Sequence, residues 1–313
     1  MRLLVTGASG FLGGTFAAYA LAQGATIGLF VRPSSPLLRL SSILDQCTLF
    51  HGDVRDKESI IAAIKTFQPD CIIHCASTLW VKPGQKGQAE HFEINAVGTL
   101  NLLEACRDGN IKLIFTGSST VYGDGSGFSE DSSPYRPNSV YGISKVAVSE
   151  LIKLYGRQGC PCAELRVFAP YGPLDSPNRL IQLVIDRASR NESLSLTSGR
   201  QKRDWVYAGD VADALWRAAQ RNIPPGSVIN IGSGKSISIK ETVTLLLSVM
   251  QADAKLAMFG AQPDRPDEMY DNGADISKAR QLLEWQPKTA LADGLAQTVA
   301  WIRAHADTAR QLH

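Results

Sequence analysis

The feature that most constrains the fold is a glycine at every third position directly after the first apolar run. Residues 2–6 are typical of a short buried strand, Gly7, Gly10 and Gly13 follow, and residues 14–23 are typical of a helix. The first glycine permits a tight turn, the second lets a phosphate approach the backbone, and the third allows close helix–strand packing. The helix N-terminus adds N–H donors and a partial positive charge. We therefore predict a dinucleotide-binding loop, whose other contact residues are Ser9, Phe11 and Leu12.

Apolar strands alternate with helical segments through the first half of the chain. The predicted strands are residues 2–6, 26–31, 48–51, 71–75, 111–116 and 163–168. The later predicted helices are 56–66, 88–107 and 139–155. Near-continuous apolar strands separated by helices are typical of a parallel sheet that is covered on both faces. We predict an α/β fold, a doubly wound parallel sheet of the Rossmann type.

After residue 168 the alternation loosens, and proline and glycine cluster between short elements. We predict a dinucleotide-binding domain at 1–168, to which 208–235 returns through a strand at 228–231. Residues 169–207 and 236–313 are predicted to form a smaller C-terminal lobe that binds substrate. A cleft between two such lobes is a common place for a small-molecule site.

Composition excludes several classes of protein. The formal net charge of the 313 residues is +2 with 20% charged residues, which argues against a nucleic-acid partner. No apolar run approaches the roughly 20 residues of a membrane helix, and the chain turns to glycine too early for a signal peptide. Six cysteines without a C-x-x-C pair indicate free thiols in the cytoplasm. Five scattered histidines predict no metal site.

The end of the second strand indicates which dinucleotide is preferred. An NAD-binding fold usually has an acidic residue there, which accepts from the ribose 2′-hydroxyl. This chain has Arg32 instead, and Ser34 and Ser35 follow. A guanidinium and two hydroxyls suit a 2′-phosphate, so we expect NADP(H), with NAD(H) as the alternative. Asp53, after the third strand, is expected to accept from the adenine amino group.

Tyr141 and Lys145 provide a candidate proton-transfer pair. A spacing of four places both side chains on one face of the predicted helix. A lysine ammonium near the phenol stabilises the phenolate, so the tyrosine can exchange a proton while a nicotinamide exchanges hydride. Ser118, just after the fifth strand, is placed to hydrogen-bond the same substrate oxygen. We predict these three residues as catalytic.

With these motifs the chain resembles the extended short-chain dehydrogenase/reductases, in particular the sugar-nucleotide epimerase/dehydratase group. The resemblance covers nearly the whole chain, including the segments 72–76, 95–105, 118–123, 203–207 and 230–234. It implies a nucleotide sugar as the substrate and a homodimer that pairs through the helices at 88–107 and 139–155. One departure is Ala169, where the family often has asparagine.

The resemblance also implies further binding residues. Those expected at the cofactor are Val54, Cys75, Ala76 and Asn95. Those expected at the substrate are Thr78, Trp80, Ser118, Ser119, Thr120, Arg179, Arg203 and Arg265. Of these, Arg203 and Arg265 are expected to hold the substrate pyrophosphate, which suits bidentate guanidinium donors.

Positions 119 and 120 narrow the reaction. Dehydratases of the family carry Asp-Glu there, whereas this chain has Ser-Thr, and neither is an acid or base near neutral pH. Chemistry that needs only hydride transfer and a tyrosine remains. We expect an NADPH-dependent 4-ketoreductase of a nucleotide-linked deoxyhexulose. The alternatives are an NAD-dependent 4-epimerase, a non-catalytic nucleotide-binding sensor and a reductase of a non-sugar ketone.

Overall fold

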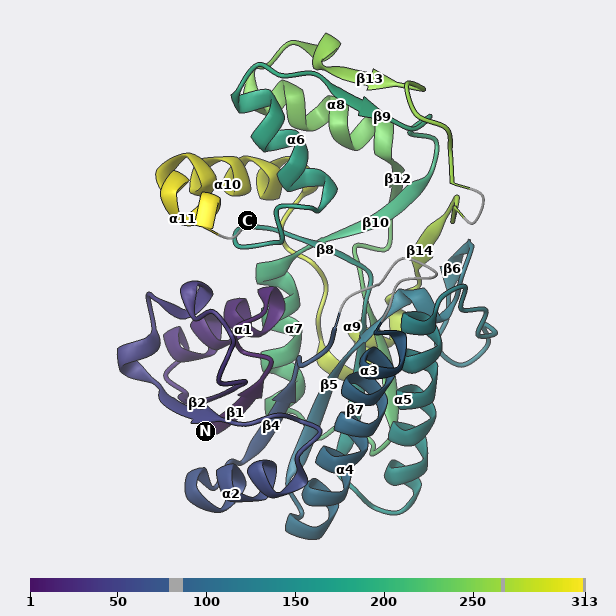
Figure 1. Ribbon diagram of the computed structural model, residues 1–313. Helices are drawn as coiled ribbons and strands as arrows, with labels where there is room; N and C mark the ends of the chain where they lie inside the picture. Colours follow the sequence, from purple (N-terminus) through teal and green to yellow (C-terminus); the bar gives the residue numbers. More distant parts are fainter. Residues whose placement is uncertain (79–86, 266–267, 312–313) are drawn as a thin grey trace.

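A seven-stranded parallel sheet forms the centre of the protein. The computed structural model describes residues 1–78, 87–265 and 268–311 (Figure 1). The strand order is β11-β7-β5-β4-β1-β2-β3, and every neighbouring pair is parallel. The bounds are β1 (Arg2–Thr6), β2 (Thr26–Val31), β3 (Thr48–His51), β4 (Cys71–His74), β5 (Lys112–Ser118), β7 (Cys162–Val167) and β11 (Ser227–Ile231). The predicted doubly wound α/β fold is confirmed, and β11 returns to the sheet as expected.

Helices cover both faces of this sheet. On one face lie α1 (Phe11–Ala22) and α7 (Ala208–Gln220), and on the other lie α2 (Lys57–Phe67), α4 (Gly98–Gly109) and α5 (Val140–Arg157). Strand β1 shows why both faces are apolar, because successive side chains alternate between them. Leu3 and Val5 join the core beneath α1 and α7, whereas Leu4 joins the core beneath the other three helices.

The second lobe has its own apolar core and small sheets. Strands β8 (Ala169–Tyr171), β10 (Lys202–Tyr207) and β12 (Ser236–Ser238) form one sheet, and β9 (Leu194–Leu196) pairs with β13 (Ala257–Phe259). Helices α6 (Leu180–Ser189), α8 (Ile239–Met250) and α10 (Leu291–Ala304) supply most of the core, and α11 (Ala306–Gln311) ends the described chain. Strand β14 (Asn272–Ala274) pairs with β6 (Gly125–Phe128) of the first domain.

Two segments differ from the sequence-based prediction. The single helix expected at 88–107 is divided into α3 (Gln88–Phe92), a π-helical turn η3 (Glu93–Val97) and α4. Helix α9 (Ser277–Leu283), expected in the second lobe, packs on β11 and α7, and Trp285 is buried in the sheet core. The predicted division into two lobes therefore remains a prediction, with the segment around α9 placed against the first domain.

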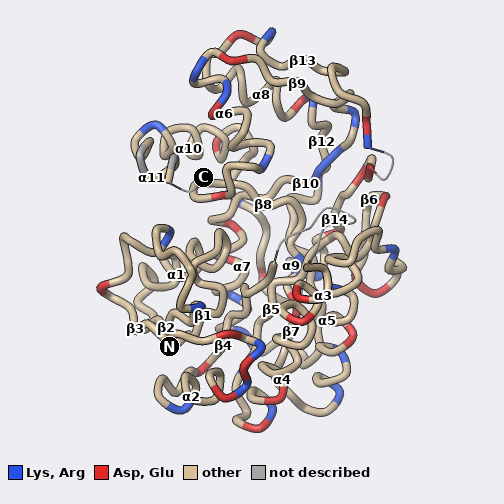
Figure 2. The backbone as a smooth tube through the Cα atoms, viewed as in Figure 1, with Lys and Arg blue, Asp and Glu red and all other residues tan. Residues whose placement is uncertain are grey.

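The surface carries charges of both signs. Lysine and arginine are interspersed with aspartate and glutamate over both lobes (Figure 2). Across residues 1–78, 87–265 and 268–311, every helix is too short or too polar to serve as a membrane span.

Candidate active site

The glycine loop after β1 leaves the N-terminus of α1 open to an anion. Gly7 has a φ of +66°, and a Cβ atom there would collide with the backbone of residues 75–76, just as one at Gly13 would collide with the Gly7 carbonyl. Helix α1 begins at Phe11 after the N-cap Gly10, and no side chain of the described residues caps it. Its free N–H groups and positive end therefore fit a dinucleotide diphosphate. The other predicted loop contacts, all half-buried at this helix end, are Ser9, Phe11 and Leu12.

The residues that follow β2 and β3 lie close together at the edge of the sheet. Arg32 and Ser34 are exposed, and Ser35 is half-buried. Arg55 forms an ion pair of 2.8 Å with Asp53. Hydrogen bonds from Arg55, and to a smaller extent the charge of Arg32, hold the pKa of Asp53 below its usual value. A cation and two hydroxyls thus lie beyond β2, and the carboxylate beyond β3 is already engaged by an arginine.

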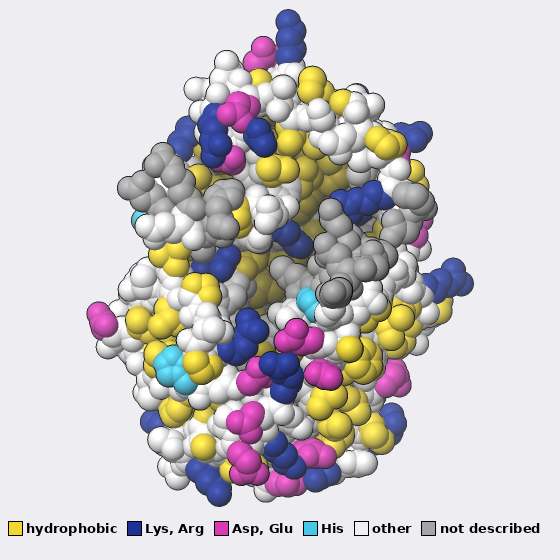
Figure 3. Space-filling view, viewed as in Figure 1, with side chains coloured by type: hydrophobic (Ala, Val, Ile, Leu, Met, Phe, Trp, Pro, Cys, Tyr) yellow, Lys and Arg dark blue, Asp and Glu magenta, His cyan; other side chains and the backbone are white. Residues whose placement is uncertain are grey.

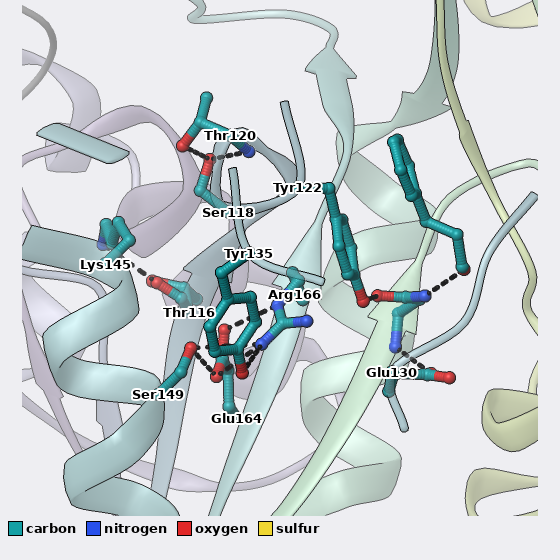
Figure 4. A network of polar contacts seen from close by, with 12 residues as sticks. Thr116, Ser118, Thr120, Tyr122, Glu130, Tyr135, Lys145, Ser149, Glu164 and Arg166 are labelled. Carbon is teal, nitrogen blue, oxygen red and sulfur yellow. Dashed lines mark hydrogen bonds and ion pairs between the residues drawn. The ribbon is translucent and has the colours of Figure 1, made fainter. Parts of the chain in front are cut away.

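Helix α5 places Tyr141 and Lys145 one turn apart, as their spacing predicts. The helix begins after Ser139, whose side chain accepts a hydrogen bond from a first-turn N–H. Lys145 is only 1% exposed, and its Nζ lies 5.5 Å from the ring centre of Tyr141 and 4.5 Å from that of Phe115. The ammonium donates to the carbonyl of Thr116 at 3.2 Å (Figure 4). The phenol therefore lies beside a buried cation.

Ser118 lies at the end of the strand that holds this lysine. It ends β5, and its Oγ accepts hydrogen bonds from the backbone N–H (3.3 Å) and Oγ1 (3.0 Å) of Thr120 (Figure 4). The Ser118 hydroxyl proton is left to donate to another group. Ser119 is buried and Thr120 is half-buried in the turn that follows. The side chains next to Ser118 are therefore hydroxyls rather than acids or bases.

Asn95 connects the loop after β4 to the catalytic helix. Its side chain is 2% exposed and lies in the π-helical turn. Oδ1 accepts from the backbone N–H of Thr78 (2.9 Å) and from Ser77 Oγ (3.0 Å), while Nδ2 donates to Ser144 Oγ (3.1 Å). Ser144 Oγ donates in turn to the carbonyl of Tyr141 at 2.7 Å. These bonds favour a positioning role for Asn95 over the predicted cofactor contact.

A buried histidine holds the first and fourth strands together behind the site. His74 Nδ1 lies 2.6 Å from Thr6 Oγ1, and Nε2 lies 2.9 Å from Thr99 Oγ1, which donates to the Asn95 carbonyl. Burial, and then the charge of Lys145, lower the pKa of His74 to about 3, so the imidazole is neutral. Nearby lie three residues predicted at the cofactor: half-buried Cys75 and Ala76 after β4, and buried Val54 after β3.

Two of the predicted substrate arginines have acidic neighbours in the second lobe. Arg203 pairs with Glu268 at 2.7 Å and donates to the Met269 carbonyl at 2.8 Å. Arg179 precedes α6 and lies 3.8 Å from the carboxylate of Asp175. Burial raises the pKa of Asp175 to about 6. The Glu268 contact was not predicted, because the pair is separated by 65 residues and has no local pattern.

The remaining predicted substrate residues have different positions. Thr78 is half-buried and bonded to Asn95, and Arg265 is exposed in the second lobe. Trp80 lies outside the described residues. Figure 3 shows a hollow between the two lobes, with apolar side chains inside it and basic side chains around it.

Sequence reasoning missed three buried charged residues near the site. Asp204 is fully buried and accepts from the backbone of Ser233, Gly234 and Ala274, which joins β10 to two other segments. Glu164 and Arg166 form an ion pair inside β7 with no exposed surface on either side chain. The signal for this pair was present, because opposite charges two residues apart in a strand face the same side.

Comparison with known proteins agrees with this arrangement. The model of the NAD dependent epimerase/dehydratase family matches residues 3–232. The UDP-glucose 4-epimerase of Mycolicibacterium smegmatis is 30% identical over 315 residues, which cover 97% of this chain and 99% of that protein.

Solved structures extend the likeness to the whole chain. A dTDP-glucose 4,6-dehydratase from Streptomyces venezuelae, solved with NAD bound, has a TM-score of 0.91 and 27% identity, with all of both chains covered. A UDP-glucose 4-epimerase from Thermotoga maritima, solved with UDP-glucose, has a TM-score of 0.89 and 25% identity, with 98% of this chain and 100% of that chain covered.

Proposed function

Because the chain belongs to the NAD-dependent epimerase/dehydratase family, we propose that it is an NADPH-dependent reductase of the 4-keto group of a nucleotide-linked deoxyhexulose. The predicted resemblance to the extended short-chain dehydrogenase/reductases is confirmed by this membership. The protein is thus an enzyme of that type, which uses a nicotinamide dinucleotide and modifies nucleotide sugars. Reduction at carbon 4 and the preference for NADPH are the proposed refinements.

The carrying observation is a complete proton-donating set without an additional acid or base. When bound, the nicotinamide dinucleotide supplies the hydride. Tyr141 donates the proton to the keto oxygen, and Ser118 hydrogen-bonds the same oxygen. The buried ammonium of Lys145 stabilises the phenolate that remains and binds the nicotinamide ribose. Elimination of water needs a further acid and base, whereas the neighbours of Ser118 are the hydroxyls of Ser119 and Thr120.

The cofactor preference rests on the end of β2. Arg32 and Ser34 are exposed there, and a guanidinium pairs well with a phosphate monoester. Since Arg55 already binds Asp53, this carboxylate is less available to attract a ribose hydroxyl. Both features support NADPH over NADH.

The substrate diphosphate is proposed to bind in the second lobe. Arg179, Arg203 and Arg265 are the expected donors, and Thr78 lines the sugar side. Because Glu268 pairs with Arg203 in this structure, the diphosphate would share or displace that carboxylate.

A 4-epimerase that keeps NAD bound is the second candidate. The related 4-epimerase and the NAD-bound dehydratase structure favour it. It would use the same tyrosine and lysine but return the hydride to the sugar it came from. A non-catalytic nucleotide sensor is disfavoured, since it has no need for all three of Ser118, Tyr141 and Lys145.

We also propose a homodimer located in the cytoplasm. Exposed apolar side chains on α3, η3 and α5 support pairing through these helices, and they are Phe92, Val97, Ile143 and Leu154. The six cysteines, all in the described part of the chain, are free thiols, as expected in a reducing compartment.

The test is NADPH oxidation with a nucleotide-linked 4-keto-6-deoxyhexose, offered with several bases. We expect one NADPH oxidised for each sugar reduced, and a loss of about 10²–10⁴ in kcat in Tyr141→Phe. Interconversion of UDP-glucose and UDP-galactose without net cofactor oxidation would instead establish the epimerase. Binding of the dinucleotide with neither reaction would support the sensor.

A further inference from the structure

Helix α5 presents a row of polar residues to the sheet. Tyr141, Lys145, Ser149 and Lys153 recur at intervals of four, which places them along one side of the helix. Lys145 is 1% exposed and Ser149 is fully buried. Polar groups buried on successive turns need partners on the elements packed against them. The proposed catalytic pair is therefore the first part of a longer series of polar contacts.

The partner of Ser149 is the buried ion pair in β7. Ser149 Oγ donates to Glu164 Oε2 at 2.5 Å and accepts from Arg166 Nη2 at 3.1 Å (Figure 4). Glu164 Oε1 accepts from Arg166 Nε at 3.1 Å. A buried ion pair is weak evidence for stability, because apolar residues of similar volume often serve the fold equally well. The geometric role of this pair therefore needs an explanation.

A second connection lies one turn further along the helix. Tyr135 Oη accepts from Lys153 Nζ at 2.9 Å and from Arg166 Nη2 at 3.2 Å. The Arg166 guanidinium thus contacts helix α5 both directly, through Ser149, and indirectly, through the hydroxyl of Tyr135. Sliding of α5 along the sheet would break both connections together.

The same ion pair also contacts the strand that carries Ser118. Gly117 lies between Thr116 and Ser118 in β5, and a Cβ atom on it would collide with the Glu164 carboxylate. Glu164 therefore packs directly against the backbone of this strand segment. Thr116 supplies the carbonyl that binds Lys145, so one carboxylate touches both the helix and the strand of the proposed catalytic set.

Arg166 extends the contacts to the turn after Ser118. Its guanidinium lies 4.7 Å from the ring centre of Tyr122 and 5.3 Å from that of Tyr135. Among the described residues Nη1 finds no hydrogen-bond acceptor, and these two aromatic faces account for its burial. Tyr122 is fixed by a hydrogen bond to Asn230 at 2.8 Å.

We propose that the Glu164–Arg166 pair, acting through Ser149, positions helix α5 against β5 so that Tyr141 and Lys145 face Ser118. All three are positioning residues in this proposal, and none needs to touch substrate. The inference rests on the proposed function, because it assigns a purpose to the placement of Tyr141.

The first test removes the helix connection alone. In Ser149→Ala we expect kcat for the keto sugar to fall about 10- to 100-fold with KM unchanged, since a misplacement of about 1 Å can cost a factor of ~100. Ser149→Thr, which keeps the hydroxyl, should restore most of the rate. Ser248→Ala, at an exposed serine of α8, is the matched control and should behave as the parent. Parental kcat in Ser149→Ala would overturn the proposal.

A substrate-independent readout separates this inference from the proposed function. In protein labelled with 3-fluorotyrosine, the ¹⁹F resonance of Tyr141, assigned by its loss in Tyr141→Phe, should move in Ser149→Ala and return in Ser149→Thr. If the parent does not oxidise NADPH but this resonance moves as expected, the proposed function fails and the positioning role stands. An unmoved resonance refutes the positioning role.

The second test distinguishes positioning from stability. The double variant Glu164→Leu/Arg166→Met removes both charges together, so no unpaired buried ion is left. We expect a melting temperature at or above that of the parent, with kcat lowered as in Ser149→Ala. A stable double variant with parental kcat would show that the pair does not position the helix.

Discussion

Replacing Lys145 with methionine is expected to stabilise the cofactor-free protein while removing most of its activity. The lysine is 1% exposed, and within the described residues its ammonium makes one hydrogen bond, to the Thr116 carbonyl at 3.2 Å. Two aromatic faces, Phe115 and Tyr141, lie 4.5 and 5.5 Å away. Methionine fills a similar volume without a charge, so the comparison isolates the ammonium.

The magnitude follows from opposing terms. Loss of the charge-assisted hydrogen bond costs about 1.5–3 kcal/mol, and loss of the cation–π contacts costs about 0.5–2 kcal/mol each. Against this, an ammonium transferred from water to the interior carries a penalty of several kcal/mol. Apolar replacement of buried ionic groups is often neutral or stabilising by about 1–4 kcal/mol. We expect the free energy of unfolding of Lys145→Met to rise within this range, by about 2–4 °C in Tm per kcal/mol.

The assay compares thermal unfolding of the cofactor-free parent and variant by circular dichroism, with kcat measured on the same samples. We expect kcat to fall by about 10²–10⁴. Lys255→Met, at an exposed lysine, controls for the loss of one charge and should leave both quantities unchanged. A Tm several degrees below the parent would refute the reasoning, because the ammonium would then support the fold rather than strain it.

Three further predictions concern the cofactor, the second lobe and pH. Arg32→Asp should weaken NADPH binding about 10- to 100-fold and improve NADH binding, as measured by fluorescence titration; unchanged affinities would remove the basis for NADPH. Asp204→Asn keeps one acceptor oxygen and leaves buried N–H groups unpaired, so Tm should fall in proportion to a loss of about 2–5 kcal/mol. Burial raises the pKa of Asp175 from 3.8 to about 6, so the carboxylate destabilises the fold by about 3 kcal/mol above pH 6 and not below pH 3.8. Asp175→Asn should therefore raise Tm at pH 7.5 and leave it unchanged at pH 3.5, whereas an equal change at both pH values would contradict the shift.

The fold could be predicted from the sequence because its signals are local. The apolar runs and the glycine spacing at 7–13 depend on neighbouring residues, and they placed the strands to within two residues at either end. The pair Tyr141 and Lys145 was predictable for the same reason, since a helix brings residues four apart to one face.

The features that were missed depend on distant partners. Asn95 sits in a π-helical turn and bonds to Ser144, 49 residues away, which an amphipathic pattern over 88–107 does not reveal. Arg203 has Glu268 as its partner across a separation of 65 residues. In each case the pattern identified the residue, and only the packing identified what it binds.

The path of the chain around Trp285 has a consequence for how the molecule comes apart. After building much of the second lobe, the chain returns to bury this indole among the side chains beneath the sheet, where Nε1 donates to the Asp210 carbonyl at 3.0 Å. It then leaves again to form α10. An N-terminal fragment ending at residue 235 would lack part of its own interior and would expose an apolar gap. We therefore expect both halves to denature in one cooperative transition, and a protease cut between them to release no independently folded piece.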